Sequence, residues 1–219
     1  MKKIFILIFL LLLTLNSFSL NSKYVIEMLH KNYDNIKTFK SNFVQFSYFK
    51  SVNMLQKYEG VLYLKRPNFM RWDYTYPEVQ SIISNGEKIW YYYPSENQVN
   101  VGKLSKKSPN EINLIFMILK GVKKIEDEFN YSLIEGNDNK NFYYLQLIPK
   151  NPTTLIEKII LTIKKNTFEI TQSHVFYTNG DIVKLIIKNP QKNVKIKDSF
   201  FNFTPPPGVE VYKIPTMQN

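Results

Sequence analysis

The sequence predicts a single domain built on one antiparallel, strongly curved β-sheet, and three observations favour this fold class. Runs rich in β-branched and aromatic residues recur at short intervals along most of the chain. Asn-Gly pairs at residues 85–86 and 179–180 each separate two such runs, which is typical of a tight hairpin turn with positive φ at its centre. Few segments are long enough for a crossover between parallel strands, so neighbouring strands are expected to run antiparallel.

A helix is expected before the first strand. Ser22 is a suitable N-cap, and Val25, Leu29 and Tyr33 recur near helical spacing. We predict that this helix ends near Asn35 and covers one end of the sheet. Strands are then predicted over residues 39–50, 54–65, 69–76, 79–84, 88–93 and 98–101.

A second helix is predicted to interrupt the strands at residues 108–120. Ser108 is its N-cap, Pro109 takes the first helical position, and Gly121 ends it. Its body is apolar almost all round, whereas a helix packed by one face on a sheet keeps a polar outer face. Two interpretations stay open, a helix buried inside the domain and a lid that faces an apolar cavity. Strands resume over residues 131–134, 142–148, 156–164, 168–177, 181–189 and 200–204.

The first residues have the pattern of a secretory signal. A basic start precedes an apolar run over residues 4–15, which is shorter than the ~20 residues that span a bilayer. Small residues follow, so we expect cleavage near Ser19, with an uncleaved anchor as the alternative. Residues 1–19 would then be a signal peptide, and residues 20–219 a single domain.

Composition limits the classes of function. The chain contains no cysteine, so disulfides and lipid attachment to a cysteine are excluded. A formal net charge of +11 is compatible with binding to nucleic acid, anionic lipid or an acidic protein. The lysines are scattered over many segments, and an exported protein does not meet nucleic acid. No nucleic-acid partner is therefore expected.

The sequence gives little support for an enzyme. His30 and His174 have no carboxylate or histidine at ligand spacing, and the chain has no phosphate loop, nucleophile elbow or zinc motif. The acidic run at residues 126–128 is expected to be a solvated turn, because calcium loops need spaced oxygen ligands and a tight glycine turn. We predict no catalytic residue, metal or cofactor. A hydrolase acting on envelope glycans or lipids would have to use Asp73 or Asp181.

Several strands have apolar side chains on both faces. In the strand over residues 88–93, Trp90 and Tyr92 share one face, while Ile89, Tyr91 and Tyr93 share the other. Each face therefore needs a cover. Composition does not decide between a second sheet and a cargo with helices covering one face.

Arg66 is an unusual residue in this chain. Arg66 and Arg71 are its only arginines, and every other basic side chain apart from the two histidines is a lysine. Leu62, Leu64 and Arg66 share one strand face, so Arg66 ends an apolar row. The guanidinium fork binds in ways that lysine does not reproduce, which indicates a role for it here. The alternative is an ordinary strand end at which Arg66 extends into solvent.

Short motifs occur along the chain in an order typical of one protein family. They are Phe43-Val44-Gln45, Arg66-Pro67-Asn68, Arg71-Trp72-Asp73-Tyr74, Ser84-Asn85-Gly86, Ile89-Trp90-Tyr91-Tyr92-Tyr93-Pro94 and the segment from Phe201 to Val211. In this order and spacing they resemble the periplasmic outer-membrane lipoprotein carrier family, LolA. The resemblance covers residues 22–212, nearly all of the chain after the expected signal.

The resemblance implies a fold, a function and partners. The fold would be mainly β, an unclosed half-barrel of about 10 or 11 antiparallel strands with helices covering the concave apolar face. The function would be that of a monomeric periplasmic chaperone, which binds the acyl chains of lipoproteins released from the inner membrane and carries them to the outer membrane. Its partners would be acylated lipoproteins, an inner-membrane ABC-type releasing complex and an outer-membrane acceptor. A related lipid- or peptide-binding envelope-stress sensor is the alternative, although we expect no additional domain after Val211.

The resemblance also implies site residues. Arg66 would bond the lid in the closed, empty state and so favour release of cargo. Trp72 matches the family's tryptophan, whereas Pro109 lies earlier than the proline that commonly precedes the family's lid helix. The residues expected to line the acyl-chain cavity are Phe43, Phe46, Leu62, Leu64, Trp72, Tyr74, Ile83, Trp90, Tyr92, Ile115, Phe116 and Leu119.

Overall fold

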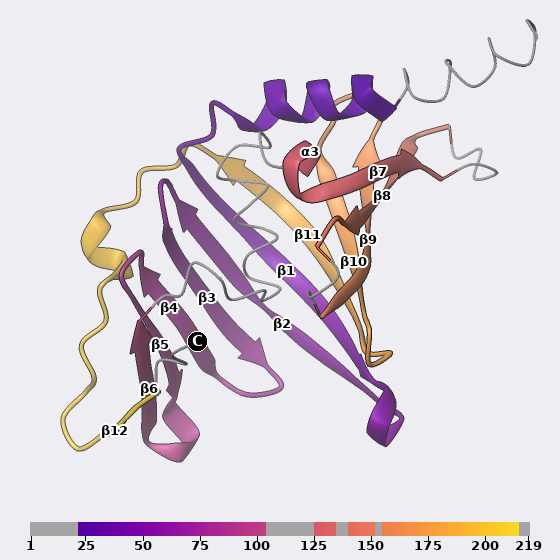
Figure 1. The fold of residues 1–219 in the computed structure, drawn as a ribbon. Coiled ribbons are helices and arrows are strands. Elements are labelled where there is room, and N and C mark those ends of the chain that lie inside the picture. The colour runs from indigo at the N-terminus through magenta and orange to yellow at the C-terminus, as the bar shows by residue number, and fades with distance from the viewer. Residues whose placement is uncertain (1–21, 104–124, 135–139, 152–154, 215–219) are drawn as a thin grey trace, which may run out of the picture.

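The computed structural model describes residues 22–103, 125–134, 140–151 and 155–214, and β-strands dominate these ranges (Figure 1). A helix over residues 22–33 precedes the first strand. Short helical turns are η1 (Lys50–Val52), η2 (Pro94–Glu96), α3 (Ile125–Glu128) and η4 (Asp198–Phe201). The strands are β1 (Thr38–Phe49), β2 (Met54–Lys65), β3 (Phe69–Tyr76), β4 (Gln80–Asn85), β5 (Lys88–Tyr93), β6 (Gln98–Lys103), β7 (Phe129–Leu133), β8 (Phe142–Pro149), β9 (Ile156–Lys164), β10 (Ile170–Tyr177), β11 (Ile182–Lys192) and β12 (Glu210–Lys213).

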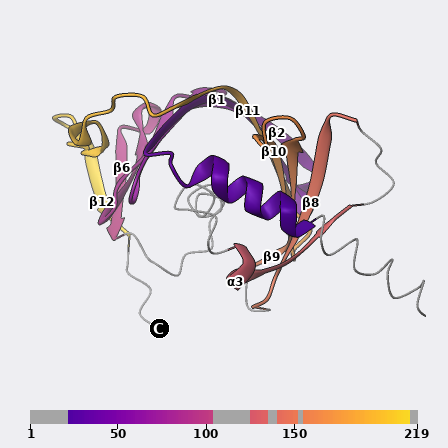
Figure 2. The same cartoon turned by 90° about the horizontal axis from the view of Figure 1, so that it is seen from above.

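The strands form one 12-stranded sheet in the order β12-β6-β5-β4-β3-β2-β1-β11-β10-β9-β8-β7. Among the described strands, β1 to β11 pair antiparallel with one another, and β12 pairs parallel with β6. Figure 2 shows that the sheet is strongly curved and that the helix over residues 22–33 lies on its concave side. The predicted curved antiparallel sheet is confirmed, and β7 and β12 are its two edges.

Most predicted strands agree with the structure to within a few residues. Both Asn-Gly hairpins are present, but only their glycines have positive φ, 88° at Gly86 and 87° at Gly180. The turns are therefore not the type I′ turns expected from the dipeptide. At the first turn the Asn85 side chain accepts hydrogen bonds from the backbone N–H groups of Glu87 and Lys88, at 3.1 and 2.9 Å. This local bonding stabilises a different turn geometry.

The strand predicted over residues 200–204 is wrong. Its first residues belong to the turn η4, which lies within an arm over residues 193–209 that we call the C-terminal arm (Figure 1). Phe201 is fully buried, while Phe200 and Phe203 pack on different strands. This segment is held against the sheet by the rings of its three phenylalanines, and it does not pair with any of the described strands through its backbone. The edge strand β12, which the sequence did not predict, follows the arm.

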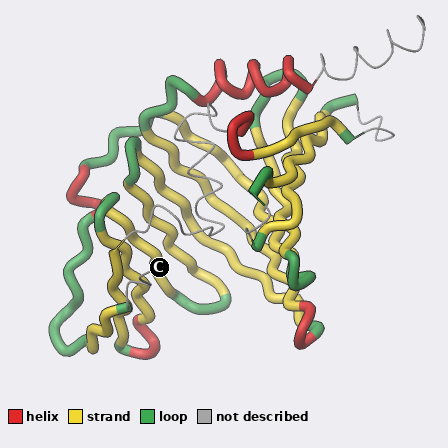
Figure 3. The backbone as a smooth tube through the Cα atoms, in the orientation of Figure 1, coloured by secondary structure: helices red, strands yellow, loops and turns green. Residues whose placement is uncertain are grey.

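The predicted second helix and the predicted signal peptide lie outside the described residues. The first helix is confirmed over residues 22–33. It contributes the fully buried side chains of Val25, Ile26 and Leu29 to a core that also contains Phe43 and Leu161 from the sheet. Figure 3 shows this helix at one end of the strands, with the β1–β2 turn at the opposite end. We call these the helix end and the open end of the concave face.

Candidate functional site

The concave face has an aromatic floor on its central strands. The ring of Phe43 in β1 lies 4.9 Å from Trp72 and 5.1 Å from Tyr74, both in β3, measured between ring centroids in edge-to-face contacts. Gly60 of β2 pairs with Phe43 on one side and with Tyr74 on the other. A Cβ at Gly60 would come within 2.1 Å of a backbone oxygen and 2.9 Å of the Phe43 ring. Glycine at this position thus lets the Phe43 ring lie across β2 and reach the aromatic side chains of β3.

Strand register decides which predicted cavity residues share this face. Leu62 pairs with Trp72, and Leu64 with Met70, so these side chains point to the same side as Phe43 and Tyr74. All of them are buried and belong to one core. The predicted cavity residues that the structure brings together on the concave face are Phe43, Leu62, Leu64, Trp72 and Tyr74.

Four predicted cavity residues lie on the convex face instead. Phe46 is three positions from Phe43 along an uninterrupted stretch of β1, so their side chains point to opposite faces. Ile83 pairs with Arg71, the neighbour of Trp72, and is likewise on the far side. Trp90 pairs with Ile83, and Tyr92 shares its face with Trp90. The assignment of Phe46, Ile83, Trp90 and Tyr92 to the cavity was wrong, because strand-by-strand patterns do not relate the faces of different strands.

The convex face of β3 to β6 has its own cover, the C-terminal arm. Ile83, Trp90 and Val99 form a second core there, packed against Phe203 and Val209 of the arm. This cover was not among the alternatives considered from the sequence, which were a second sheet and a cargo. The polypeptide itself thus covers the outer apolar face.

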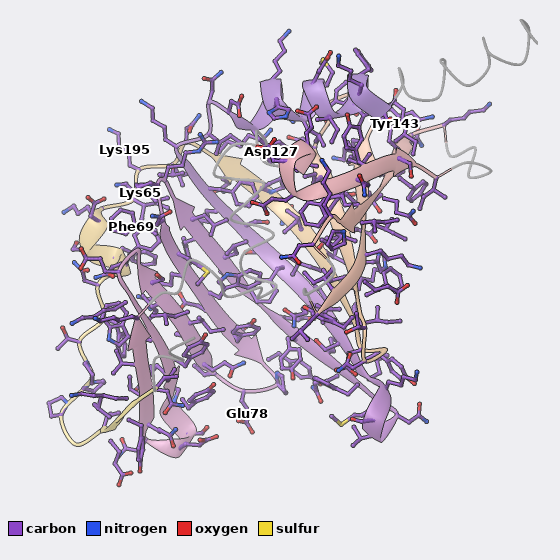
Figure 4. The ribbon with its side chains drawn as sticks, in the orientation of Figure 1. Lys65, Phe69, Glu78, Asp127, Tyr143 and Lys195 are labelled. Carbon is purple, nitrogen blue, oxygen red and sulfur yellow. The ribbon has the colours of Figure 1, made fainter. Side chains whose placement is uncertain are left out.

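Polar contacts also attach the C-terminal arm. Arg71 pairs with Asp73 at 2.9 Å, donates to the Phe200 carbonyl at 3.3 Å, and stacks its guanidinium on the Phe200 ring. Lys65 donates to the carbonyl of Ile196 at 2.6 Å. Figure 4 shows Lys65 beside the start of this arm. The second arginine of the chain thus holds the arm on the convex face.

Sequence reasoning missed apolar residues on the concave face of the neighbouring strands. Ile82 pairs with both Trp72 and Tyr91, which places all three side chains on the concave side. The hairpin at residues 85–86 relates the faces of β4 and β5 to each other, but the register between β3 and β4 is also needed to relate both strands to Trp72. The second half of the sheet supplies more of the same core, from Phe129, Leu145, Leu147, Ile159, Leu161, Ile163, Val175 and Leu185.

Arg66 contacts the first helix. Its Nη2 donates to the backbone carbonyl of Tyr33 at 2.7 Å, and Tyr33 is the last residue of the helix over residues 22–33. Carbonyls at a helix C-terminus have no partner within the helix, so a charged donor satisfies one of them and complements the helix dipole. The Arg66 backbone N–H also donates to the Lys37 carbonyl at 2.9 Å. A side chain that ends an apolar row therefore binds the C-terminal end of a helix.

Further polar contacts attach the end of that helix to β10 and β11. Asn32 donates to the carbonyl of Phe168 at 2.9 Å and accepts from Lys192 at 3.1 Å. The Tyr33 hydroxyl accepts from the backbone N–H of Ile170 at 2.9 Å. Burial raises the pKa of Tyr33 from 10.0 to about 12. The helix end is thus held by hydrogen bonds as well as by its apolar face.

Three buried polar atoms lack a partner. In the ranges that the structure describes, Nε2 of His30, Nε of Arg66 and Nε1 of Trp72 have no hydrogen-bond partner, although all three atoms are shielded from solvent. An unsatisfied buried donor costs about 1–3 kcal/mol. Some polar atoms on the concave side are therefore buried without a hydrogen bond.

The open end of the concave face contains a pocket of about 370 Å³. Gln45 and Ser47 of β1 and Tyr58 of β2 line it, as do Tyr74 and Gln80 on the other side. The hairpin between β10 and β11 closes one wall, where Asp181 accepts a hydrogen bond from the Lys50 backbone N–H at 2.9 Å. The concave face is thus apolar toward the helix and mixed polar and aromatic at the open end.

The side chains that the sequence offered for catalysis or metal binding lie on different elements of the described ranges. Nowhere in the described ranges do three or more histidine, cysteine, aspartate or glutamate side chains gather as a metal site. Burial and the nearby Lys184 ammonium lower the pKa of His174, and strand register places this histidine on the convex face opposite Lys184. Asp73 is bonded by Arg71 and Ser81, also on the convex face. The predicted lid residues Ile115, Phe116 and Leu119 lie outside the described residues.

The geometry of an open curved sheet with an apolar concave face agrees with a match to a known family. The family model described as "Outer membrane lipoprotein carrier protein LolA" matches residues 34–204. The chain belongs to the LolA family. None of the helices in the described ranges has the length and apolar character needed to cross a membrane.

Relatives with 30% sequence identity support the same assignment. The outer-membrane lipoprotein carrier protein of Methylobacillus flagellatus is 30% identical over 182 residues, which cover 79% of this chain and 84% of the relative. The protein of the same name from Nitrosomonas europaea is 30% identical over 177 residues, covering 80% and 82%. A solved structure of an uncharacterized conserved protein from Thermus thermophilus covers 89% of this chain and 99% of its own, with a TM-score of 0.55 and 12% identity. That likeness concerns the fold alone.

Proposed function

We propose that this LolA-family protein is a periplasmic chaperone that holds the acyl chains of lipoproteins and carries them from the inner to the outer membrane. The observation that supports this function most directly is the apolar, aromatic concave face of an open sheet. The names of its relatives agree with such a cargo. No enzymatic step is part of the proposal.

The physical case rests on the exposure of acyl chains to water. Each methylene moved out of water contributes about 0.8 kcal/mol, so a bare lipoprotein with several chains does not leave a bilayer at a useful rate. A concave apolar face lowers this barrier by replacing lipid contacts with protein contacts. The core around Phe43 and Trp72 offers such a surface.

Release requires that the empty carrier be stabilised in its own right. The bond from Arg66 to the Tyr33 carbonyl is the contact that we assign to this role. It anchors the helix over residues 22–33 at the apolar concave face, and loading would weaken it. The lid residues Ile115, Phe116 and Leu119 belong to the same proposal, as a second cover over the chains.

The remaining parts of the proposal concern export and partners. Residues 1–19 would direct export and be removed, leaving a monomeric carrier over residues 20–219. An inner-membrane ABC-type complex would supply the energy for loading, because the motifs of the chain include no nucleotide site. An outer-membrane acceptor would receive the cargo.

Native mass spectrometry of protein purified from the periplasm tests the function itself. We expect a mature chain that begins near Leu20 and carries acylated polypeptide at a ratio of one to one. An empty chain, or one with bound glycan, would overturn the carrier function.

Substitution of Arg66 tests the release step. Charge-assisted hydrogen bonds contribute about 1.5–3 kcal/mol, and 1.4 kcal/mol corresponds to a tenfold change, so Arg66→Leu should slow release about tenfold or more without impairing loading. Arg66→Lys should be intermediate, because it keeps the charge and loses the fork. The measurement is transfer from the loading complex to the acceptor, with loading and release scored separately.

Arg71→Leu is the matched control, since it removes the other arginine, which lies on the convex face. It should lower stability while the release rate of the folded protein stays unchanged. Impaired loading with normal release in the Arg66→Leu variant would show that Arg66 binds cargo directly.

A further inference from the structure

Buried polar side chains interrupt the concave face at its open end. Gln45 is 8% exposed and Ser47 is 3% exposed, and both line the pocket of about 370 Å³. They follow Phe43 on the same face of β1, so the row changes from an aromatic ring to an amide and a hydroxyl within four residues. Burying polar groups on an otherwise apolar face costs free energy unless a partner bonds them. Their position therefore calls for an explanation in terms of what this face binds.

The polar groups keep hydrogen-bonding capacity. Gln45 Nε2 donates to the Ser47 hydroxyl oxygen at 3.0 Å. An amide nitrogen has two N–H groups and a hydroxyl has one O–H, so this bond leaves a second N–H and the serine hydrogen available. Both belong to side chains that line the pocket. The pair thus offers two donor hydrogens at the boundary of the apolar floor, together with the amide oxygen of Gln45 as an acceptor.

We propose that this pocket binds the neutral ester or amide linkages that join acyl chains to the head of the cargo. The inference rests on the proposed carrier function and extends it by assigning an orientation. The carbonyl groups accept hydrogen bonds from Gln45 and Ser47, the chains extend over the Phe43 floor toward the helix end, and the polypeptide of the cargo leaves at the open end.

The charges around the pocket select for neutral linkages. Among the described residues that line it there is no lysine or arginine, and there is one carboxylate, Asp181. Both carboxylate oxygens of Asp181 have local partners, since one accepts from the Lys50 backbone N–H and the other from Asn179. The Lys50 ammonium lies beside Gly180 and offsets the Asp181 charge, so the wall has no net positive charge that would hold phosphate or a fatty-acid carboxylate. Esters and amides carry no charge and are compatible with it.

The size of the pocket agrees with a linkage region. A volume of about 370 Å³ is at the lower end of the range of about 300–1,000 Å³ for small-molecule sites. Tyr58 and Tyr74, which flank the pocket, provide rings that pack on the glycerol-like carbons while their neighbours bond the carbonyl groups. Whole acyl chains would need the apolar floor as well.

The test compares two lipopeptides of the same sequence and chain length, one with ester-linked acyl chains and one with ether-linked alkyl chains. An ether oxygen is a weaker acceptor than an ester carbonyl. In the purified mature protein, residues 20–219, we expect about tenfold tighter binding of the ester form, measured by competition with a fluorescent lipid. A third probe, a phosphatidic acid with the same chains, should bind more weakly than the ester lipopeptide.

The double variant Gln45→Leu with Ser47→Ala should remove the preference for the ester form. Replacing both partners of a buried hydrogen bond by apolar groups of similar shape is close to neutral for folding, which circular dichroism and urea unfolding check directly. Gln172→Leu is the matched control, because register places Gln172 on the convex face, outside the pocket. It should keep the preference of the wild type.

The outcomes separate this inference from the carrier function. Equal binding of ester and ether forms by the wild type, or a preference that survives in the double variant, would overturn the pocket assignment and leave the carrier function in place. Failure of both lipopeptides to bind would overturn the carrier function. Tighter binding of phosphatidic acid would overturn the selection for neutral linkages and show that the open end recognises anions.

Discussion

One segment packs on each side of the sheet, and the two differ in their main contacts, although Arg71 and Lys65 also hold the arm by hydrogen bonds. The C-terminal arm lies on the convex face through aromatic rings, with Phe201 fully buried and Phe203 packed on Tyr92. The helix over residues 22–33 lies on the concave side, where its apolar face packs in the core and its C-terminal end is held by polar contacts from Arg66 and Lys192.

The two kinds of contact suit different roles, one in stability and the other in binding and release of cargo. Aromatic contacts on the convex face stabilise a single packing arrangement, because a ring that leaves its neighbours would be exposed to water. Hydrogen bonds at the helix end can be exchanged for bonds to water or to cargo, at a cost of about 1.5–3 kcal/mol for a charge-assisted bond. A carrier that must expose and cover an apolar face benefits from the second kind of contact on its concave side. We therefore expect substitutions on the convex face to change stability and those on the concave side to change binding.

The largest expected effect comes from a pair of neighbours in β5 on opposite faces. Trp90 lies on the convex face under the C-terminal arm, and Tyr91 on the concave face with Ile82. Trp90→Ala should lower the free energy of unfolding by about 3–5 kcal/mol and leave acyl-chain binding unchanged in the folded fraction. Tyr91→Ala should lower stability less and weaken binding.

Urea unfolding and titration with a fluorescent lipid measure the two quantities. Loss of binding in the Trp90→Ala variant, at a concentration of urea where it remains folded, would contradict the division of the two faces.

A smaller effect is expected at alkaline pH on the concave side. The pKa of Tyr33 is raised from 10.0 to about 12 by burial, so the folded state favours the neutral phenol. Its contribution to stability is complete below pH 10 and is lost as the pH rises through about 12, an effect of about 2–3 kcal/mol. Tyr33→Phe should remove this part of the pH dependence.

Comparing the urea unfolding of both proteins at about pH 9 and at about pH 11 to 12 gives the difference. The variant also loses the bond from the Ile170 N–H, which sets a constant offset at all pH values. Parallel pH profiles of wild type and variant would show that Tyr33 does not titrate with unfolding.

The smallest effect is expected in acid. Burial raises the pKa of Glu169, but the Lys192 ammonium, which donates to it at 3.0 Å, and Lys164 lower it more, so that it lies below the ordinary value of 4.5. The stability from this carboxylate is present above pH 4.5 and is lost as the pH falls through its lower folded value, an effect below about 1 kcal/mol for partly exposed pairs.

Glu169→Gln should flatten the acid limb of the stability profile by that amount. Because Lys192 also bonds Asn32, the protection factors of the amides in the helix over residues 22–33, which compare each exchange rate with its intrinsic rate at the same pH, should fall in acid in the wild type before those of the sheet. A fall of protection in the C-terminal arm instead would contradict the assignment of this contact to the helix.

Most of the strands, the first helix and the family could be predicted from the sequence, whereas the strand over residues 200–204 was wrong and β12 was not predicted. The strands over residues 54–65, 69–76, 88–93 and 156–164 were predicted with the bounds that the structure shows, because their apolar patterns are long and their turns are marked by Gly, Pro and Asn. The sequence also predicted correctly which side chains of a single strand share a face, as for Leu62 and Leu64. The motif around Arg66 identified a residue that binds the end of a helix.

Which face of each strand is concave follows only from how the strands pair and pack in three dimensions. Alternation along a strand shows which of its side chains share a face. Only the register between neighbouring strands shows which of these sets lie on the same side of the sheet. For that reason Trp90 and Ile83, assigned to the cavity from their apolar character, lie on the convex face. The C-terminal arm that covers them comes from roughly one hundred residues further along the chain, and contacts of such long range follow from packing and leave no local pattern in the sequence.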